Sequence, residues 1–258
     1  MYQEDIVFVG SYGGRRARLL RPEGGTYTDG GPKSLLFLGD IPLGAYSIRD
    51  LAKLGIGYFL ISVNRQQDRA EWDRIFGDGV IPHVATQYAT RLCDFCIHDM
   101  GKPTDIFSAT ETQKFLSRYP NVAILWCFGD DYLPSNHWEI LINAYRTTGM
   151  SVATRKSASR FDGVLAVSPV FDDDYTIRGW TEGGAIPEWV ANPPMVISPS
   201  DREAFLFHTR DRDTAGVLMR TYQNGRPLRT VDGNGFVNVN TYKDLLEVCS
   251  IIGCQLPP

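Results

Sequence analysis

The sequence has no hydrophobic segment long enough to cross a membrane and no basic leader. Its longest apolar run is the seven residues 122–128, whereas a membrane-spanning helix needs about 20 apolar residues. The first five residues, MYQED, include no basic residue, which a secretory leader would carry. We therefore expect a protein that neither enters nor crosses a membrane.

Strong charge of either sign is also lacking. The chain of 258 residues has 26 basic and 30 acidic residues, a formal net charge of −4, and is 43% hydrophobic. This composition is typical of a folded globular protein, and the lack of a basic field argues against a nucleic-acid partner. An anion-binding site must then be built by a local cluster.

Cysteine is scarce and is not patterned as a disulfide framework. The five cysteines are an odd number in a long chain, which favours a reducing, cytoplasmic setting with buried thiols. Cys93 and Cys96 form one C-x-x-C pair, for which a redox role or a zinc site shared with Cys249 and Cys254 are the alternatives. The four histidines lack metal-ligand spacing and are interpreted as structural.

What the chain does have is alternation of apolar and amphipathic segments. Short apolar runs predict buried strands at 6–9, 35–38, 58–63, 122–128 and 151–154, with a final strand at 235–240. Helical spacing and turn signals predict helices at 45–54, 68–76, 110–119, 135–145 (capped by Ser135) and 242–251 (capped by Thr241), and another from the S-x-x-E at 200–203. Between about 160 and 197 short β-like segments alternate with turns. We therefore expect an α/β fold with a mostly parallel sheet.

The first candidate site is the segment GSYGGRRAR, residues 10–18, directly after the first expected strand. Glycines allow the backbone amides to approach phosphate oxygens, and Arg15, Arg16 and Arg18 supply forked donors. The segment lacks both a Walker lysine and a complete G-x-G-x-x-G. A surface turn with solvated arginines is the alternative, and the residues alone do not decide between them.

Two further candidates follow the strands at 122–128 and 235–240. Asp130 and Asp131 can hold Mg²⁺, which prefers a few carboxylates together with phosphate oxygens, or they can form an acidic turn. Asn238 and Asn240 can offer neutral oxygen ligands, or Asn240 and Thr241 can be turn and cap residues. Ligands of α/β sheets bind beyond the carboxyl ends of the strands, so we expect the loops after Val9, Phe128 and Val239 to form the site.

The order of these pieces resembles the sugar-phosphate nucleotidyltransferases of the nucleotidyltransferase superfamily. The resemblance rests on segments in family order, namely GSYGGR (10–15), PKSLL (32–36), GDIPL (39–43), YSIRDL (46–51), GI (55–56), FGDG (76–79), GD (129–130), GV (163–164), Glu182 and NVNTYKDL (238–245). It implies a Rossmann-like GT-A fold, with a mostly parallel, mixed sheet flanked by helices and a small β-rich acceptor-binding insertion. It further implies one domain, 1–258, with a nucleotide-binding half to about 155 and an acceptor-binding half from about 156.

The resemblance also implies an activity. A sugar 1-phosphate would attack the α-phosphorus of a nucleoside triphosphate with Mg²⁺ as cofactor, releasing pyrophosphate and a nucleotide sugar. The implied catalytic residues are Arg15, Lys33 and Asp130, and the implied metal ligands are Asp130 and Asn238. The implied nucleotide-binding residues are Gly10, Ser11, Gly13, Gly14, Arg18 and Gly129, and the implied acceptor-binding residues are Gly163 and Glu182.

The chain departs from the family pattern at several positions. Gly14 replaces a usual threonine, Arg16 a usual leucine and Gly183 a usual lysine, and an insertion over 18–31 allows Arg18 to take the place of Arg15. These departures leave two alternatives open, namely transfer to a non-sugar phosphate or phosphonate and a catalytically degenerate nucleotide-binding protein. A glycosyltransferase is a third alternative, because it would share the fold and use acidic metal ligands, but the D-x-D motif is missing at 129–131. The base and the state of the chain as monomer or homo-oligomer are also left open.

Overall fold

The computed structural model describes residues 5–13, 20–21, 25–26, 31–63, 66–76, 79, 92, 94–99, 110–157, 167–182, 188–203 and 225–255. The chain divides into two compact units, each made of segments that are distant in sequence. The first unit comprises Met1–Pro103, Cys127–Ser135 and Gly235–Pro258, and the second comprises Thr104–Trp126 and Asn136–Asn234. The predicted halves 1–155 and 156–258 stay a prediction.

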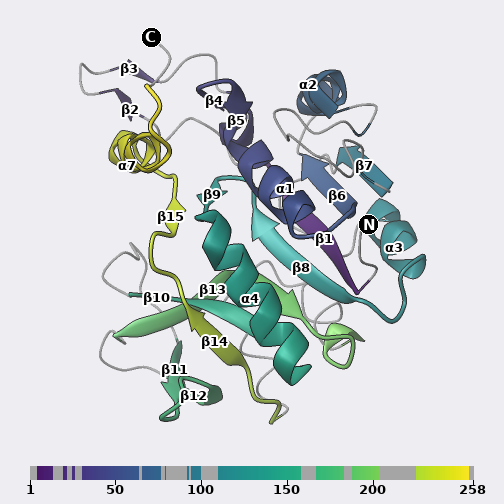
Figure 1. The fold of residues 1–258 in the computed structure, drawn as a ribbon, viewed down its shortest axis with the longest axis vertical. Helices are drawn as coiled ribbons and strands as arrows, with labels where there is room; N and C mark the ends of the chain where they lie inside the picture. Colours follow the sequence, from purple (N-terminus) through teal and green to yellow (C-terminus); the bar gives the residue numbers. More distant parts are fainter. Residues whose placement is uncertain are drawn as a thin grey trace. The chain divides into compact units, whose positions relative to one another are not determined.

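Three parallel strands form the sheet of the first unit (Figure 1). They are β1 (Ile6–Ser11), β6 (Tyr58–Val63) and β7 (Asp94–Asp99). Phe8 of β1 is in register with Phe59 of β6, which in turn is in register with Phe95 of β7. Their rings follow one another at centroid distances of 5.3 and 6.4 Å. The apolar runs at 6–9 and 58–63 are therefore buried parallel strands, as predicted.

The same unit contains the helices α1 (Leu43–Lys53) and α2 (Gln66–Phe76). The helix α2 packs on β6 and β7 through the fully buried side chains of Trp72 and Phe76, whose rings stack at 5.4 Å. The helix α1 ends before Gly55, which has a φ of +89°. Glycine accepts this left-handed conformation without the steric cost that other residues carry.

The expectation of a central strand at 35–38 is wrong. Lys33–Leu35 forms a 3₁₀ turn, η2, and β4 (Phe37–Leu38) pairs only with β5 (Ile41–Pro42) in a short hairpin. Leu35, Leu36 and Leu38 are nevertheless buried, because the run fills the core beside α1 without joining the sheet. A short apolar run shows burial, but its periodicity does not distinguish a strand from a buried turn.

The C-terminal segment contributes a short strand pair and a helix to the first unit. The strand β15 (Val237–Asn238) pairs antiparallel with β9 (Asp131–Tyr132), so the strand predicted over 235–240 is limited to two residues. The helix α7 (Tyr242–Ile252) begins with a reciprocal capping box between Thr241 and Asp244, which confirms Thr241 as its cap. The short pair β2 (Leu20–Arg21) and β3 (Gly25–Thr26) is also described.

The second unit has a mixed sheet in the order β14, β10, β13, β8. These strands are β14 (Arg229–Asp232), β10 (Val152–Ser157), β13 (Trp189–Ile197) and β8 (Ala123–Phe128). The strand β10 runs parallel to β14, whereas β13 runs antiparallel to both β10 and β8. The strand β8 begins in the second unit, and its last residues, Cys127 and Phe128, belong to the first.

Helices and a hairpin complete the second unit. The helices are α3 (Thr110–Ser117) and α4 (Ser135–Thr148). The hydroxyl of Ser135, the expected cap of α4, donates to the carboxylate of Asp50 at 2.7 Å. The hairpin of β11 (Val167–Phe171) and β12 (Ile177–Glu182) lies within the region, about 160 to 197, where short β-segments were predicted. The helix expected after Ser200 lies mostly outside the described residues.

The predicted fold class is confirmed, because the structure is α/β with a mostly parallel, mixed sheet and helices packed on it. None of the helices in the described part of the chain is long and apolar enough to span a membrane.

His137 of α4 is a buried histidine whose titration should affect stability. Its Nε2 lies 3.1 Å from Oγ1 of Thr154, and burial, assisted by the positive charge of Lys156, lowers the pKa of His137 from 6.5 to about 4. Asp232 opposes this shift only in part. The folded protein therefore binds this proton less readily than the unfolded chain does, and stability falls as the pH drops through the interval between the two values.

We expect this histidine to remove about 2 kcal/mol of stability between pH 7 and pH 5. The measurement is urea unfolding at both pH values for the wild type and for His137→Gln, which has no imidazole to titrate. The difference between their pH dependences isolates His137 from the carboxylates. Equal pH dependence of the two proteins would show that His137 titrates normally.

Candidate functional site

Three loops of the first unit meet beyond the ends of β1, β8 and β15, and backbone hydrogen bonds hold them together. The amide of Gly129, after β8, donates to the carbonyl of Ser11 at 2.9 Å. The amide of Val239, after β15, donates to the carbonyl of Asp130 at 2.8 Å. The sequence analysis predicted that these loops form the site. They are adjacent in the structure, at the edge where α/β sheets bind ligands.

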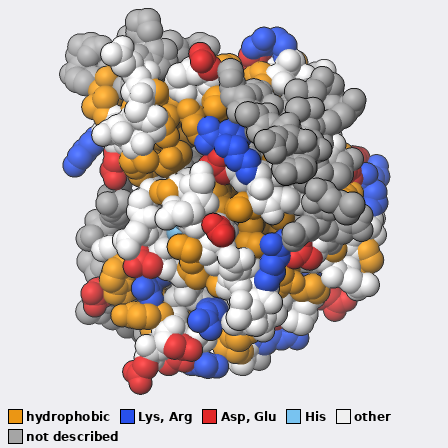
Figure 2. Space-filling model, in the orientation of Figure 1, with side chains coloured by type: hydrophobic (Ala, Val, Ile, Leu, Met, Phe, Trp, Pro, Cys, Tyr) orange, Lys and Arg blue, Asp and Glu red, His pale blue; other side chains and the backbone are white. Residues whose placement is uncertain are grey.

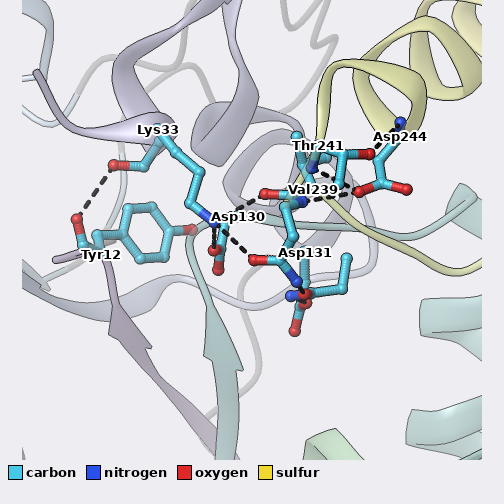
Figure 3. Close-up of polar contacts among 10 residues, drawn as sticks. Tyr12, Lys33, Asp130, Asp131, Val239, Thr241 and Asp244 are labelled. Atoms are coloured by element: carbon cyan, nitrogen blue, oxygen red, sulfur yellow. Dashed lines mark hydrogen bonds and ion pairs between the residues drawn. The ribbon is translucent and has the colours of Figure 1, made fainter. Parts of the chain in front are cut away.

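Lys33 of the η2 turn is the centre of the polar contacts in this region (Figure 3). Its ammonium forms an ion pair with the carboxylate of Asp130 and donates to the carbonyl of Val239 at 2.7 Å and to Oδ1 of Asn240 at 3.0 Å. The side chain is only 4% exposed. Because an ammonium has three N–H donors, each of them has an oxygen partner, which makes burial of this charge tolerable.

The two adjacent aspartates have different environments. The side chain of Asp130 keeps 16% of its surface exposed and faces the Lys33 ammonium. Asp131 is buried, and its Oδ1 accepts a hydrogen bond from Nδ2 of Asn238 at 2.7 Å. Asp130 is therefore the carboxylate that a ligand can reach, while Asp131 fixes the orientation of Asn238.

The amides of Asn240 and Asn238 link Lys33 to Asp131 in one chain of hydrogen bonds. The lysine can only donate, so Asn240 must present its oxygen to Lys33 and its NH₂ group to Oδ1 of Asn238. Asn238 then presents its own NH₂ group to Asp131, which as a carboxylate only accepts. Both amide orientations follow from these partners, and the oxygen of Asn238 is directed toward Asn240.

The capping box of α7 anchors this chain of amides. The carboxylate of Asp244 accepts hydrogen bonds from the backbone amides of Asn240 and Thr241, at 3.0 and 2.7 Å. The helix start and the loop that carries Asn240 are therefore one structural unit, so the position of Asn240 beside Lys33 depends on the cap.

Tyr12 anchors the loop that follows β1. Its side chain is fully buried and its hydroxyl donates to the carbonyl of Gly44 at 2.8 Å. Its carbonyl accepts from the hydroxyl of Ser34 at 3.2 Å, beside Lys33. Burial, with the nearby Cys127 and Asp131, raises the pKa of Tyr12 well above its ordinary value, so the phenol stays neutral and acts as a structural donor.

The tyrosine ring also explains a glycine at the site. A Cβ atom on Gly129 would lie 2.5 Å from Tyr12 Cγ, closer than real Cβ atoms approach other heavy atoms, and 3.0 Å from Ser34 Cβ. Gly129 is thus the residue that lets the loop bearing Asp130 pack against the loop bearing Tyr12.

The structure brings together some of the residues expected from the sequence. Gly129 and Asp130 belong to the connected loops, and Ser11 and Asn238 end the strands that lead into the other two. Lys33 contacts Asp130 from the η2 turn. Gly13 directly follows Tyr12, and Gly10 directly precedes Ser11. Glu182 ends β12 in the second unit, opposite Val167, and its side chain is outside the description. The residues that lie outside the described part of the chain are Gly14, Arg15, Arg18 and Gly163.

Three residues at this site make contacts that the sequence analysis did not predict. Tyr12 and Ser34 were not singled out, and Asn240 was left open between a ligand and a turn residue. No pattern in the sequence marks Tyr12 as buried, since it stands between Ser11 and Gly13 in a polar turn. The N-x-N spacing of Asn238 and Asn240, which places both amides on one side of an extended segment, was the signal for Asn240.

The chemistry of the oxygen donors fits a hard divalent cation such as Mg²⁺. The carboxylate of Asp130, the side-chain oxygen of Asn240 and the carbonyl of Val239 already surround the positive charge of Lys33. Among the described residues no group of three or more His, Cys, Asp or Glu side chains is placed to hold a metal ion. A few protein oxygens completed by phosphate oxygens and water are what Mg²⁺ commonly uses.

No family model and no curated protein matches this chain. Solved structures with the same fold do match over nearly the whole of both chains. The inositol-1-phosphate CTP transferase from T. maritima has a TM-score of 0.65 and 16% identity, covering 98% of both chains. A UDP-glucose pyrophosphorylase bound to UDP-glucose has a TM-score of 0.66 and 14% identity, covering 98% of this chain and 99% of that one.

A UTP-bound UGPase from Acinetobacter baumannii matches as well, with a TM-score of 0.65 and 12% identity, covering 98% of this chain and 94% of that one. These proteins have the fold that the sequence resemblance implied. The likeness shows that this chain shares their fold over 98% of its length.

Proposed function

We propose that this protein is a Mg²⁺-dependent nucleotidyltransferase that joins a nucleoside triphosphate to a sugar 1-phosphate. The observation that carries the proposal is the meeting of Lys33 and Asp130 at the end of the strands, in a fold shared with proteins named as a CTP transferase and a UDP-glucose pyrophosphorylase. An oxygen of the acceptor phosphate attacks the α-phosphorus, and the bond from that phosphorus to the bridging oxygen of pyrophosphate breaks.

This reaction needs charge neutralisation and positioning more than a protein nucleophile, because the acceptor phosphate is already anionic. Lys33 would neutralise charge on the α-phosphate. The backbone of the loop at Gly10, Ser11 and Gly13 would cradle the triphosphate. Asp130 and Asn238 would hold Mg²⁺, which when bound supplies further neutralisation of phosphate charge; the oxygen of Asn238 has two lone pairs and can serve both Asn240 and a ligand.

The remaining roles rest on the sequence resemblance. Arg15, or Arg18 in its place, would contact the leaving pyrophosphate, together with Gly14 of the same loop. Gly163 and Glu182 would bind the acceptor sugar. We propose the cytoplasm as the location, since a supply of nucleoside triphosphates is required.

The test is pyrophosphate release from purified protein given each common nucleoside triphosphate, Mg²⁺ and a panel of sugar 1-phosphates. We expect release with at least one pair, abolished when a chelator removes the metal. Absence of release with every pair would refute the proposed reaction. Calorimetry would then separate a degenerate triphosphate-binding protein from one that does not bind nucleotide.

A non-sugar acceptor is the second candidate, and two observations favour it. Gly183 stands where the resembled family carries a lysine beside the acceptor, and one structural neighbour is named for inositol 1-phosphate, a cyclitol phosphate. The panel should therefore include inositol 1-phosphate and a small phosphonate. A product nucleotide without a sugar, identified by mass spectrometry, would decide for this candidate.

A further inference from the structure

The position of Lys33 has a consequence for the order of events at the site. Its ammonium lies among three oxygens, from Asp130, Val239 and Asn240, and is buried there. The arrangement is a small oxygen cage that already contains one cation. All three N–H donors of the ammonium are used inside the protein, so none remains to donate to a phosphate.

Asp130 is the one formal negative charge among these three oxygen partners. A divalent cation that uses this carboxylate brings two positive charges close to the ammonium, and like charges at short separation in a partly buried site repel strongly. The carboxylate therefore favours one cation at a time. Either the Lys33 ammonium or the metal ion can contact the Asp130 carboxylate directly, but not both together.

We propose that Lys33 competes with a divalent cation for Asp130, acting as a built-in counterion that leaves the carboxylate when the metal–triphosphate complex arrives. This inference rests on the proposed function and concerns the same site. Release from Asp130 returns an N–H donor to the Lys33 ammonium, which can then contact the α-phosphate while it keeps the carbonyl of Val239 and the amide of Asn240 as partners.

The anchoring of the two partners indicates which of them moves. The backbone of Asp130 is held by the amide of Val239 and follows the tightly packed Gly129, so the short aspartate side chain starts from a fixed position. The Lys33 ammonium sits on a flexible four-carbon stem, while its backbone is fixed through the neighbouring Ser34. Separation of the Lys33 ammonium from Asp130 thus needs only a small rotation about the bonds of the lysine side chain.

The first experiment measures Mn²⁺ binding without nucleotide, by calorimetry and by electron paramagnetic resonance. Lys33→Gln and Lys33→Met remove the competing charge and should bind Mn²⁺ about tenfold or more tightly than the wild type. Lys33→Arg keeps the charge and should bind as weakly as the wild type, and the exposed Lys53→Gln is the matched surface control. Adding Asp130→Asn to Lys33→Gln should remove the gain. Equal Mn²⁺ affinity of the Gln, Arg and wild-type proteins would overturn the proposal.

A second measurement uses the wild type, in case the Lys33 variants fold poorly. Acetylation of Lys33 by acetic anhydride, followed by mass spectrometry, should accelerate as Mg²⁺ is titrated in, relative to Lys53 in the same sample. The acceleration should be absent in Asp130→Asn. A Lys33 labelling rate that does not respond to Mg²⁺ would contradict the competition.

These readouts distinguish the inference from the proposed function. Neither measurement includes a nucleotide or an acceptor, so both report on the competition alone. If the wild type releases pyrophosphate but the Lys33 variants gain no metal affinity, the competition is wrong and the proposed function stands. If the Lys33 variants gain metal affinity but the wild type releases no pyrophosphate, the competition stands and the proposed function is wrong.

Discussion

Asp130→Asn is expected to reduce the rate of pyrophosphate release by about 10²–10³-fold or more. The substitution keeps the shape of the side chain but removes the one formal negative charge among the three oxygen partners of Lys33. In the variant the ammonium would keep the carbonyl of Val239, Oδ1 of Asn240 and the new amide oxygen as acceptors. The loss should therefore fall on activity more than on folding.

The measurement pairs initial rates at saturating substrates with urea unfolding of the same preparations. We expect Asp130→Asn to lose on the order of 1–3 kcal/mol of stability, because a buried ammonium loses its ionic partner and keeps its hydrogen bonds. Asp40→Asn, which removes an exposed carboxylate of the same unit, should change neither quantity appreciably. An Asp130→Asn enzyme that retained wild-type turnover would remove Asp130 from the mechanism.

The parts of the fold that could be predicted from the sequence are those that depend on neighbouring residues in the chain, such as continuous apolar runs and helix caps. Residues 6–9 and 58–63 are apolar on both faces and bounded by turn residues, so few structures other than a covered parallel strand suit them. The capping box at Thr241 and Asp244 is a local interaction, and local interactions are visible in a short window of sequence. The loops after β1, β8 and β15 could be chosen because ligand sites follow strand ends in such sheets.

The contacts between distant segments could not be predicted in the same way. Lys33 and Asn240 are separated by 207 positions in the chain, and no local pattern relates them. The apolar run at 35–38 is buried in the η2 turn and the β4–β5 hairpin and not in the sheet, which its apolar character alone does not predict. Tyr12 was also beyond prediction, since its burial depends on space left by glycines far along the chain.

Gly129→Ala is expected to have a large effect on stability, because the Tyr12 ring occupies the space beside Gly129. The added methyl would lie 2.5 and 2.6 Å from two atoms of the Tyr12 ring. The ring cannot move aside easily, because it is fully buried and its hydroxyl is bonded to Gly44. Overpacking of this kind typically costs a few kcal/mol, and we expect a loss of about 3 kcal/mol in the free energy of unfolding, with reduced turnover because Asp130 must shift with its loop.

Gly179→Ala is the matched control, since a Cβ at Gly179 in β12 meets no atom within 4 Å, and a change within about 0.5 kcal/mol is expected there. A double-mutant cycle then tests the cause. Tyr12→Leu shortens the ring side chain that opposes Gly129, so combining it with Gly129→Ala should cost less than the sum of the two single changes by about 1 kcal/mol or more. If the changes in the free energy of unfolding are strictly additive, the added methyl group clashes with atoms other than those of Tyr12. In that case Tyr12 does not set the position of Asp130.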